Sequence, residues 1–301
     1  MALPYQALYD LAIVGGGING AGIARDAAGR GLRTLLVEKD DLASHTSSWS
    51  TKLIHGGLRY LEYYEFRLVA EALAEREVLL RAAPQIISPL QFVLPHEPHL
   101  RPAWMIRAGL FLYDHLGGRK SLPSSFGVAD LAASKWGAGL KSTFHHGFVY
   151  SDARVDDARL VVFNAISARE KGADIRTHTK LTAARRESGV WRITLQDASG
   201  ETQEVNARAL VNAAGPWVGE VLNATLQSKA PAHMRLVKGS HIVVPRLYEH
   251  DSCYFFQNAD RRIFFAIPYE RDFTLIGTTD LEYHGDPARA VIRADEVTYL
   301  C

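Results

Sequence analysis

The feature that most constrains this sequence is a glycine-rich turn between two short apolar runs near the N-terminus. Leu11–Val14 leads into Gly15-Gly16-Gly17-Ile18-Asn19-Gly20, and a second apolar run, Thr34–Val37, ends at Glu38. The order predicts a buried strand, a tight turn, a helix over residues 21–28 and a second strand. A chain with this order is expected to form the βαβ unit that binds a dinucleotide.

The glycines of this turn have distinct predicted roles. Gly15 makes the turn, Gly17 lets a pyrophosphate approach the backbone, and Gly20 lets the helix pack against the sheet. Asn19 belongs to the same expected set of cofactor contacts. Glu38 follows about 20 residues later, where a carboxylate accepts hydrogen bonds from ribose hydroxyls. An acid at this point favours FAD or NAD over NADP.

Composition narrows the remaining classes of protein. The chain has 301 residues, is 47% hydrophobic and carries a net charge of +1, so we expect about two domains and no nucleic-acid partner. Cys253 and Cys301 are the only cysteines, which predicts no disulfide framework and fits a reducing compartment. The N-terminus does not resemble a signal peptide, and no apolar run approaches the length that spans a bilayer.

The hydrophobic pattern predicts an α/β domain interleaved with a smaller antiparallel sheet. Helices are expected over residues 61–83 and 103–116 and from Asp156 to about Gly172, whereas 86–99 is a short apolar run among prolines. Predicted strands are Trp191–Leu195, Glu201–Val205, Ala209–Ala213, His241–Val244, Cys253–Gln257, Ile263–Ile267 and Phe273–Ile276. We therefore assign residues 1–85 and 150–232 to a cofactor-binding domain, and residues 86–149 and 233–301 to a substrate domain.

The segment after Glu38 favours a flavin over a nicotinamide cofactor. A nicotinamide enzyme would continue with further parallel βαβ units. Here a polar loop, Ser44–Lys52, comes next and is followed by a long helix and a second sheet. This order is typical of a flavoprotein whose loop wraps around the pyrophosphate and the ring.

Several motifs resemble those of the FAD-dependent glycerol-3-phosphate dehydrogenases, and the resemblance is greatest to the bacterial aerobic, respiratory members. They are Gly15–Gly22, Thr46–Leu53, Ile54–Leu61, Leu100–Trp104, Tyr150–Asp152, Val155–Leu160, Val211–Trp217, Lys238–His241 and Ile276–Asp280. The resemblance extends over essentially the whole chain, and His55–Tyr60 with Gly277–Asp280 is far more specific than the glycine turn.

The resemblance implies an amino-acid-oxidase-like flavoprotein fold and FAD-dependent oxidation of glycerol 3-phosphate to dihydroxyacetone phosphate. In that family the hydride passes to the flavin and the electrons to membrane quinone. The bacterial enzyme is a dimer in the cytoplasm, peripheral to the inner membrane. The family continues beyond Cys301 with a flavin-clamping segment and a helical cap, so the resemblance implies an N-terminal portion that by itself binds FAD weakly or does not turn over.

The resemblance also implies site residues, each of which has a plainer interpretation. Arg59 and Tyr60 match the substrate contacts, although a surface arginine beside a core tyrosine gives the same pattern. The expected cofactor contacts beyond the glycine turn are Ser47, Ser48, Lys52, Leu53, Ala214 and Gly215. The plainer interpretation is an N-capping cluster for the serines and an ordinary turn for Ala214 and Gly215.

No catalytic base is assigned by the sequence. His55 and His241 are weak candidates, because either can accept the hydroxyl proton as the hydride leaves, yet a histidine bonded to backbone groups fits as well. His96, His99, His145 and His146 predict no metal site, since Pro98 breaks the first pair and adjacent strand residues point apart.

A stripe of residues on the predicted 103–116 helix has two interpretations. Trp104, Ala108, Phe111 and Leu112 lie near Arg101, Arg107, Arg119 and Lys120, a pattern that fits contact with a membrane surface or a core-facing helix. Two other functions stay open at this point: an amino-acid or amine oxidase of the same fold, and a non-catalytic FAD-binding fragment.

Overall fold

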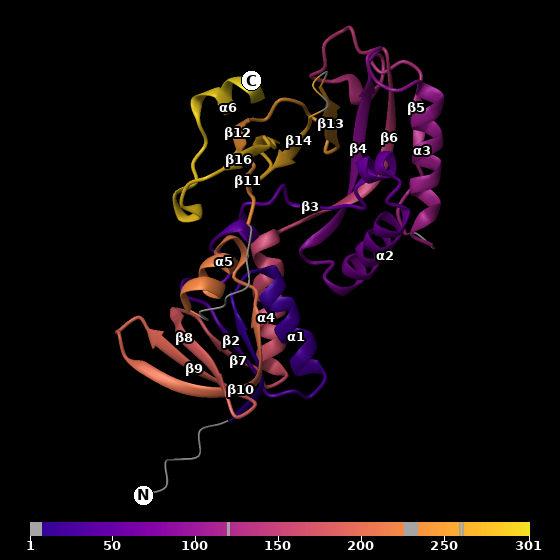
Figure 1. The fold of residues 1–301 in the computed structure, drawn as a ribbon. Coiled ribbons are helices and arrows are strands. Elements are labelled where there is room, and N and C mark those ends of the chain that lie inside the picture. Colours follow the sequence, from indigo (N-terminus) through magenta and orange to yellow (C-terminus); the bar gives the residue numbers. More distant parts are fainter. Residues whose placement is uncertain (1–7, 119–120, 226–233, 259, 261) are drawn as a thin grey trace, which may run out of the picture. The chain divides into compact units, whose positions relative to one another are not determined.

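The computed structural model describes residues 8–118, 121–225, 234–258, 260 and 262–301 (Figure 1). Within these residues the chain forms two compact units. Unit 1 comprises Met1–Ser50, Asp156–Leu236 and His284–Arg289, and unit 2 comprises Thr51–Val155, Val237–Tyr283 and Ala290–Cys301. The segment 51–85, which the sequence assigned to the cofactor domain, packs within unit 2. The functions given to the two domains stay predictions.

Unit 1 is built on a six-stranded sheet with the strand order β7-β2-β1-β10-β9-β8. The strands are β1 (Leu8–Val14), β2 (Thr34–Val37), β7 (Asp174–Arg176), β8 (Thr179–Glu187), β9 (Val190–Asp197) and β10 (Thr202–Asn212). The helices are α1 (Ile18–Gly29), α4 (Asp157–Glu170) and the short α5 (Val218–Glu220), which continues into a π-helical turn over Val221–Thr225. Neighbouring strands from β7 to β10 in that order pair in parallel. The last two pairs, β10 with β9 and β9 with β8, are antiparallel.

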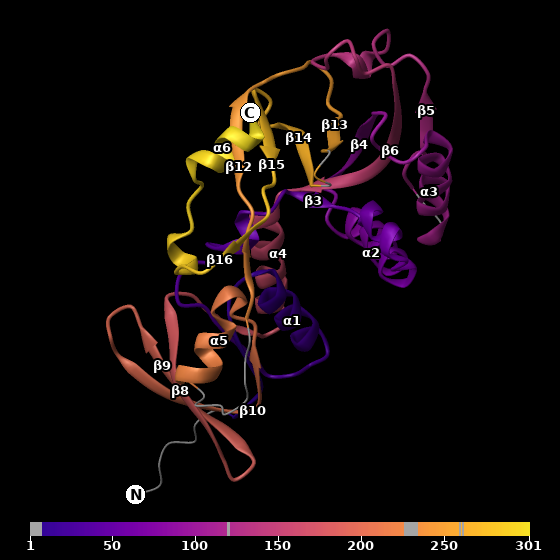
Figure 2. The same cartoon turned by 45° about the horizontal axis from the view of Figure 1, so that its top comes forward.

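Alternating side chains of β1 pack on opposite faces of this sheet. Ile13 lies in a cluster with Ala24 of α1 and Ala168 of α4, and Figures 1 and 2 show these two helices side by side. Ala12 and Val14 lie in the cluster on the other face, which β8 and β9 help to form. Small alanines let the helices approach closely. Asp156, where the sequence predicts the helix to begin, caps α4 by accepting a hydrogen bond from the Arg159 amide (3.0 Å).

Unit 2 is built on an eight-stranded sheet. The order is β12-β15-β14-β13-β4-β6-β3, with β5 also paired to β6. These strands are β3 (Leu53–Ile54), β4 (Ile87–His96), β5 (Phe126–Val128), β6 (His146–Val155), β12 (His241–Pro245), β13 (Cys253–Gln257), β14 (Ile263–Tyr269) and β15 (Phe273–Gly277). The remaining elements are α2 (Phe66–Ala82), α3 (Ala103–Leu116), α6 (Ala294–Leu300), and the pair β11 (Leu236–Lys238) and β16 (Leu281–Tyr283).

Both faces of the large sheet are covered. Phe92 and Tyr150 pack on the face that α2 and α3 cover, whereas Val93 and Val149 pack on the face that carries Leu300 of α6. The four strands predicted to form an antiparallel meander from His241 to Ile276 are all present, and β13, β14 and β15 pair in chain order as predicted. The prediction is wrong for β12, which pairs with β15 instead of β13. Double burial also explains why β6 escaped prediction, because its side chains are buried almost without alternation.

Two predicted element boundaries are wrong for identifiable reasons. The predicted strands 201–205 and 209–213 form the single strand β10, whose first half pairs with β9 and whose second half pairs with β1. The run among prolines at 86–99 is the ten-residue strand β4. Its second neighbour, β13, pairs only with Phe92 and Val93, so Pro89 and Pro95 lie where that neighbour requires no amide donor.

Candidate functional site

The glycine turn of unit 1 lies at the carboxyl ends of two parallel strands. β1 and β10 remain paired up to Val14 and Asn212. Gly15 has a φ of +110°, and a Cβ there would lie 2.4 Å from the Ala213 carbonyl oxygen. A Cβ on Gly20 would lie 1.9 Å from the Gly15 carbonyl oxygen. The turn therefore requires glycine at both positions, and it lies against Ala213 and Ala214 at the end of β10.

Glu38 is held at this turn by backbone donors. The Gly16 amide donates to its Oε2 (2.6 Å) and the Asp40 amide to its Oε1 (2.9 Å). The side chain is buried. A carboxylate has about four lone-pair directions, so it can accept further hydrogen bonds while both backbone contacts persist. The acid predicted to hold a ribose thus has a fixed position with acceptor capacity to spare.

The serine loop closes on the first turn of α1. The Ile18 amide donates to Ser47 Oγ (3.0 Å), whereas Ser48 Oγ donates to the His45 carbonyl (3.0 Å). Asn19 is exposed in that same turn. Because Ser47 accepts through its oxygen, its hydroxyl proton can be given to an anion at the helix N-terminus. Ser48 uses its proton within the loop.

A ring-and-cation group beside Glu38 was not singled out from the sequence. His45 Nε2 lies 2.7 Å from Asp40 Oδ2, and the His45 ring centroid is 4.5 Å from that of Trp217. Lys39 Nζ lies 4.8 Å from the centre of the Trp217 ring. The group brings together residues that follow β2, residues of the serine loop and a residue that follows β10. These segments are far apart in the sequence, so only the structure shows that they meet.

Lys52 and Leu53 belong to unit 2, unlike the other predicted cofactor contacts. Leu53 pairs with Arg154 in the β3–β6 ladder, and the Lys52 carbonyl accepts a hydrogen bond from the Val155 amide (2.9 Å). The predicted cofactor contacts are therefore divided between the two units.

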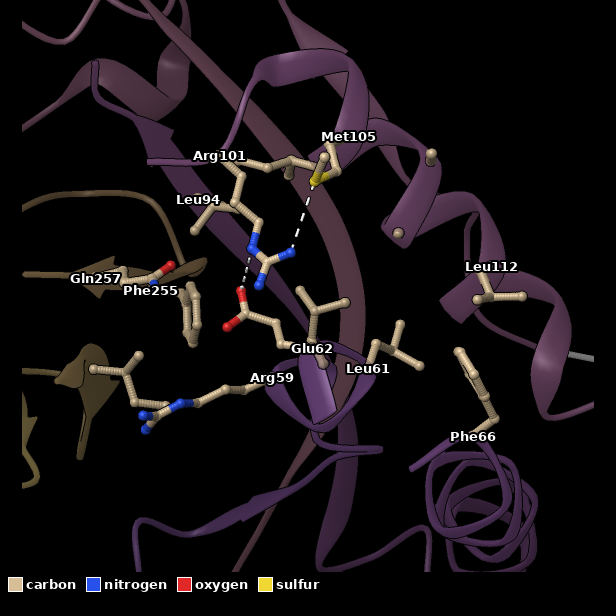
Figure 3. Close-up of a pocket in the computed structure, with 15 residues that line it drawn as sticks. Arg59, Leu61, Glu62, Phe66, Leu94, Arg101, Met105, Leu112, Phe255 and Gln257 are labelled. Atoms are coloured by element: carbon tan, nitrogen blue, oxygen red, sulfur yellow. Dashed lines mark hydrogen bonds and ion pairs between the residues drawn. The ribbon is translucent and has the colours of Figure 1, made fainter. Parts of the chain in front are cut away.

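Unit 2 contains a pocket of about 340 Å³ between α3, the Leu58–Tyr63 3₁₀ helix and the ends of β13 and β14 (Figure 3). Its walls are mostly apolar. The residues that line it include Leu58, Leu61, Leu94, Met105, Ile106, Ala108, Leu112, Phe255 and Ile263.

Three charged side chains reach the same pocket. Arg101 Nε forms an ion pair with Glu62 Oε1 (3.3 Å). Arg59, in contrast, has no hydrogen-bond or ion-pair partner among the described residues, although it is half-buried. Figure 3 shows the Arg59 side chain extending past Phe255, away from the α3 side of the pocket. A partly desolvated, unpaired guanidinium is suited to binding an anion, above all a phosphate.

Tyr60 and His55 flank this arginine, on a turn made by Gly57. Gly57 has a φ of +72°, and a Cβ there would lie 2.4 Å from Tyr60 Cδ2, so the ring covers the glycine backbone. Tyr60 is 48% exposed, which excludes the interpretation as a core tyrosine. His55 Nδ1 accepts a hydrogen bond from the Gly57 amide (3.0 Å), which leaves its Nε2 to carry the proton of the neutral ring.

His241 stands at the start of β12, where its Nε2 lies 3.1 Å from Thr51 Oγ1. The neighbouring motif residues Lys238, Ser240 and Thr279 converge on the buried carboxylate of Glu296 in α6. Burial alone favours the neutral acid, but these donors outweigh it and lower the pKa of Glu296 to about 2. Glu296 thus ties α6 to the turn that precedes His241.

Three of the four histidines considered for a metal site, His96, His99 and His146, lie within hydrogen-bond distance of backbone carbonyls. His96 Nε2 lies 3.0 Å from the Arg101 oxygen, and His146 Nδ1 lies 2.6 Å from the Ala129 oxygen. Among the described residues, no group of three metal-ligating side chains converges. In that same part of the chain no helix combines the length and the apolar character that crossing a membrane requires.

The α3 stripe divides between surface and pocket. Trp104 is 69% and Phe111 58% exposed, whereas Leu110 and Tyr113 face the core. Ala108 and Leu112 line the pocket. The expected basic neighbours Arg119 and Lys120 lie outside the described residues.

Comparisons with known proteins agree with this geometry. Residues 10–301 match the family described as FAD dependent oxidoreductase. The chain is 61% identical to a glycerol-3-phosphate dehydrogenase of Pseudomonas aeruginosa, over 99% of this chain and 57% of the relative. It is 56% identical to a D-erythritol 1-phosphate dehydrogenase of Brucella abortus, over 97% of this chain and 58% of the relative.

Among solved structures, the glycerol-3-phosphate dehydrogenase from Bacillus halodurans complexed with FAD has a TM-score of 0.73 at 30% identity. That match covers 97% of this chain and 51% of the solved chain. The chain thus spans little more than half the length of the curated relatives it matches.

Proposed function

Because the chain belongs to the FAD-dependent oxidoreductase family, we propose that it binds FAD and oxidises glycerol 3-phosphate to dihydroxyacetone phosphate. The observation that carries the substrate class is Arg59, a half-buried guanidinium without a partner among the described residues. It reaches a pocket whose walls are mostly apolar and whose other arginine, Arg101, is paired with Glu62. The two relatives named above are called dehydrogenases of phosphorylated polyols, which supports the same class.

The residues of the glycine turn fit the cofactor. A Cβ at Gly17 would lie 3.0 Å from Ser47 Oγ, so the glycine keeps open the path to the first amides of α1. We assign Gly15, Gly17, Asn19 and Gly20 to the pyrophosphate together with the Ser47 hydroxyl, and the remaining acceptor positions of Glu38 to the ribose. When bound, FAD supplies the hydride acceptor.

Oxidation of the secondary alcohol removes a hydride from carbon and a proton from the hydroxyl. Arg59 would hold the phosphate through its planar fork, and the exposed Tyr60 hydroxyl would add a hydrogen bond. The proton requires an acceptor, for which we retain His55 and His241. His55 can accept it only at Nδ1, by releasing the Gly57 amide, because its Nε2 already carries the proton of the neutral ring. A histidine serves as base only when neutral, so replacing the true base by glutamine would abolish the rise of the rate with pH, and replacing the other would leave it intact.

Three alternatives remain distinct from this proposal. D-erythritol 1-phosphate offers the same phosphate on a longer polyol, and the 56% identity to its dehydrogenase favours it as a second candidate. An amino-acid or amine oxidase would bind a carboxylate instead. A non-catalytic fragment would bind FAD but oxidise no substrate.

We further propose, from the family resemblance, that membrane quinone accepts the electrons and that the protein works as a homodimer on the cytoplasmic membrane surface. The exposed Trp104 and Phe111 of α3 with the neighbouring Arg101 support a membrane contact. Sedimentation with anionic vesicles should fall when Trp104 and Phe111 are both replaced by serine.

The visible spectrum of the purified chain with FAD, recorded without oxygen, tests the proposal. Glycerol 3-phosphate should bleach the flavin bands, D-erythritol 1-phosphate should bleach them less readily, and glycine should leave them unchanged. Arg59→Gln should weaken glycerol 3-phosphate binding about thirtyfold, as loss of a charged hydrogen bond does. Arg101→Gln is the matched control, because Arg101 is already paired with Glu62. Equal effects of the two substitutions would refute the assignment of Arg59.

A further inference from the structure

The turn that carries Arg59 is attached to a buried hydrogen-bond network. The Gly56 amide donates to the Tyr113 hydroxyl (2.7 Å), and that hydroxyl donates to Asp152, at 2.8 Å from Oδ2 and 3.0 Å from Oδ1. Tyr113 belongs to α3 and Asp152 to β6, and each is 1% exposed. A loop amide is thus bonded to the interior of unit 2 through two side chains from distant elements.

The network continues to an equally buried ion group. Arg76 Nη1 donates to Asp152 Oδ1 (2.5 Å), and Nη2 donates to Glu77 Oε1 (3.2 Å). Glu77 also accepts hydrogen bonds from the amide and the hydroxyl of Ser121. Apolar residues of equal volume would stabilise such a core at least as well as buried ions do. Stability alone therefore gives no reason for this group, whereas the bond to Gly56 does.

Packing leaves Gly56 no freedom to move inward. A Cβ there would lie 2.5 Å from Leu73 Cδ2 and 2.8 Å from the Tyr113 hydroxyl. The β3–β6 ladder holds the chain just before this point, at Ile54 and Ala153. Just after it, the chain turns at Gly57 into the 3₁₀ helix that presents Arg59.

We infer that Tyr113, Asp152 and Arg76 are positioning residues that fix the backbone at Gly56 and thereby set where the Arg59 guanidinium stands in the pocket. None of the three contacts the substrate. The inference rests on the proposed function for its ligand, a phosphorylated polyol. Its structural part, the anchoring of Gly56, stands independently.

The substitution Tyr113→Phe tests the inference, because it removes the single hydroxyl that bridges Gly56 and Asp152. Tyr150→Phe is the matched control. Tyr150 lies in the same apolar cluster, with its ring centroid 5.9 Å from that of Tyr113, but no hydrogen bond of Gly56 involves it. Calorimetry would measure the affinity for glycerol 3-phosphate in the presence of FAD, and amide exchange would report on Gly56.

We expect Tyr113→Phe to weaken glycerol 3-phosphate binding about tenfold and to speed amide exchange at Gly56 by a similar factor. A factor of about ten is what the loss of one hydrogen bond causes. FAD affinity should match that of Tyr150→Phe. In an Arg59→Gln background, Tyr113→Phe should cause no further loss, which a merely structural role would not predict.

Equal binding by Tyr113→Phe and Tyr150→Phe, or additive losses with Arg59→Gln, would overturn the inference. The rate of amide exchange at Gly56 can also be measured in the unsubstituted chain. Rapid exchange there would overturn the inference as well. If the unsubstituted chain binds no glycerol 3-phosphate, the proposed function fails instead. Comparison of Gly56 exchange between the two variants then decides whether the anchor exists.

Discussion

Glu296 offers the sharpest test of how unit 2 is held together. Its carboxylate accepts hydrogen bonds from Lys238 Nζ (2.5 Å), Ser240 Oγ (2.8 Å), Thr279 Oγ1 (2.7 Å) and the Arg293 amide (2.9 Å). The Glu296 side chain is 1% and the Lys238 side chain 10% exposed. Glu296→Gln keeps the shape and removes the charge. Its oxygen can still face Lys238 and the Arg293 amide, and its NH2 then faces the Ser240 and Thr279 hydroxyls.

Two separate arguments give the same loss of folding stability for this substitution. Removing one partner of a buried ion pair costs about 3–5 kcal/mol, and the lower end applies because Lys238 keeps the Val291 carbonyl as an acceptor. Independently, lowering the pKa of Glu296 from 4.5 to about 2 corresponds to about 3 kcal/mol of preference for the charged form in the folded state. We therefore expect Glu296→Gln to destabilise unit 2 by about 3 kcal/mol at neutral pH.

The pH dependence has a definite sign. A carboxyl whose pKa is lower in the folded state stabilises the fold above its unfolded pKa, and this contribution is lost as the pH falls from 4.5 toward 2. The difference in stability between the unsubstituted chain and Glu296→Gln should therefore shrink across that range. Other acidic groups titrate in both proteins and cancel in the difference.

Cys253 provides the probe, because it is fully buried in the core of unit 2, whereas Cys301 is exposed. In a Cys301→Ser background, labelling of Cys253 in urea reports when unit 2 opens, with dithiodipyridine as the reagent because it stays reactive toward thiols in acid. Asp295→Asn is the control, since Asp295 is the exposed neighbour of Glu296 and its pair with Arg293 lies in solvent. A loss no larger than that of Asp295→Asn, or a difference that does not change with pH, would refute the reasoning.

Three further predictions concern unit 1. Gly20→Ala should abolish FAD binding and lower the melting temperature, because its Cβ would lie 1.9 Å from the Gly15 oxygen; normal binding in a fluorescence titration would contradict the predicted turn. Glu38→Gln should weaken FAD binding about tenfold, as loss of charged hydrogen bonds to a ribose does, with unchanged glycerol 3-phosphate specificity in any loaded protein. Ser47→Ala should weaken FAD binding and Ser48→Ala should not, because Ser48 donates its hydroxyl proton within the loop whereas Ser47 accepts there. Equal losses of FAD affinity in the two variants, measured by calorimetry, would exclude this distinction.

The parts of the fold that the sequence predicted best are those whose signal is local. α3 was predicted at its observed bounds and β2 also, since apolar periodicity and flanking turn residues define them. β6 was missed because it is buried on both faces and so has no alternation. β10 was divided in two because its polar middle marks a change of partner strand rather than a turn.

The candidate site divides in the same way. Gly15 and Glu38 were predicted because the βαβ unit places them by chain order alone, and the pairing of β1 with β10 then brings Ala214 beside them. Trp217 and His45 belong to motifs that were noticed, yet the tilted contact of their rings and the approach of Lys39 to Trp217 join residues from distant parts of the sequence. No periodicity could have placed them together.

The contrast between Arg59 and its proposed anchor shows where sequence reasoning stops. Arg59 could be named without a structure because its motif resembles that of the FAD-dependent glycerol-3-phosphate dehydrogenases, and a guanidinium is suited to an anion. Its position in the pocket depends on Gly56, whose amide is bonded to a tyrosine 57 residues away, and that tyrosine is bonded to an aspartate a further 39 residues along. In the sequence Tyr113 is only one apolar position of a helix. The network must therefore be tested by breaking the bond at Gly56, because a change at Arg59 alone removes the ligand contact and cannot report on what holds it.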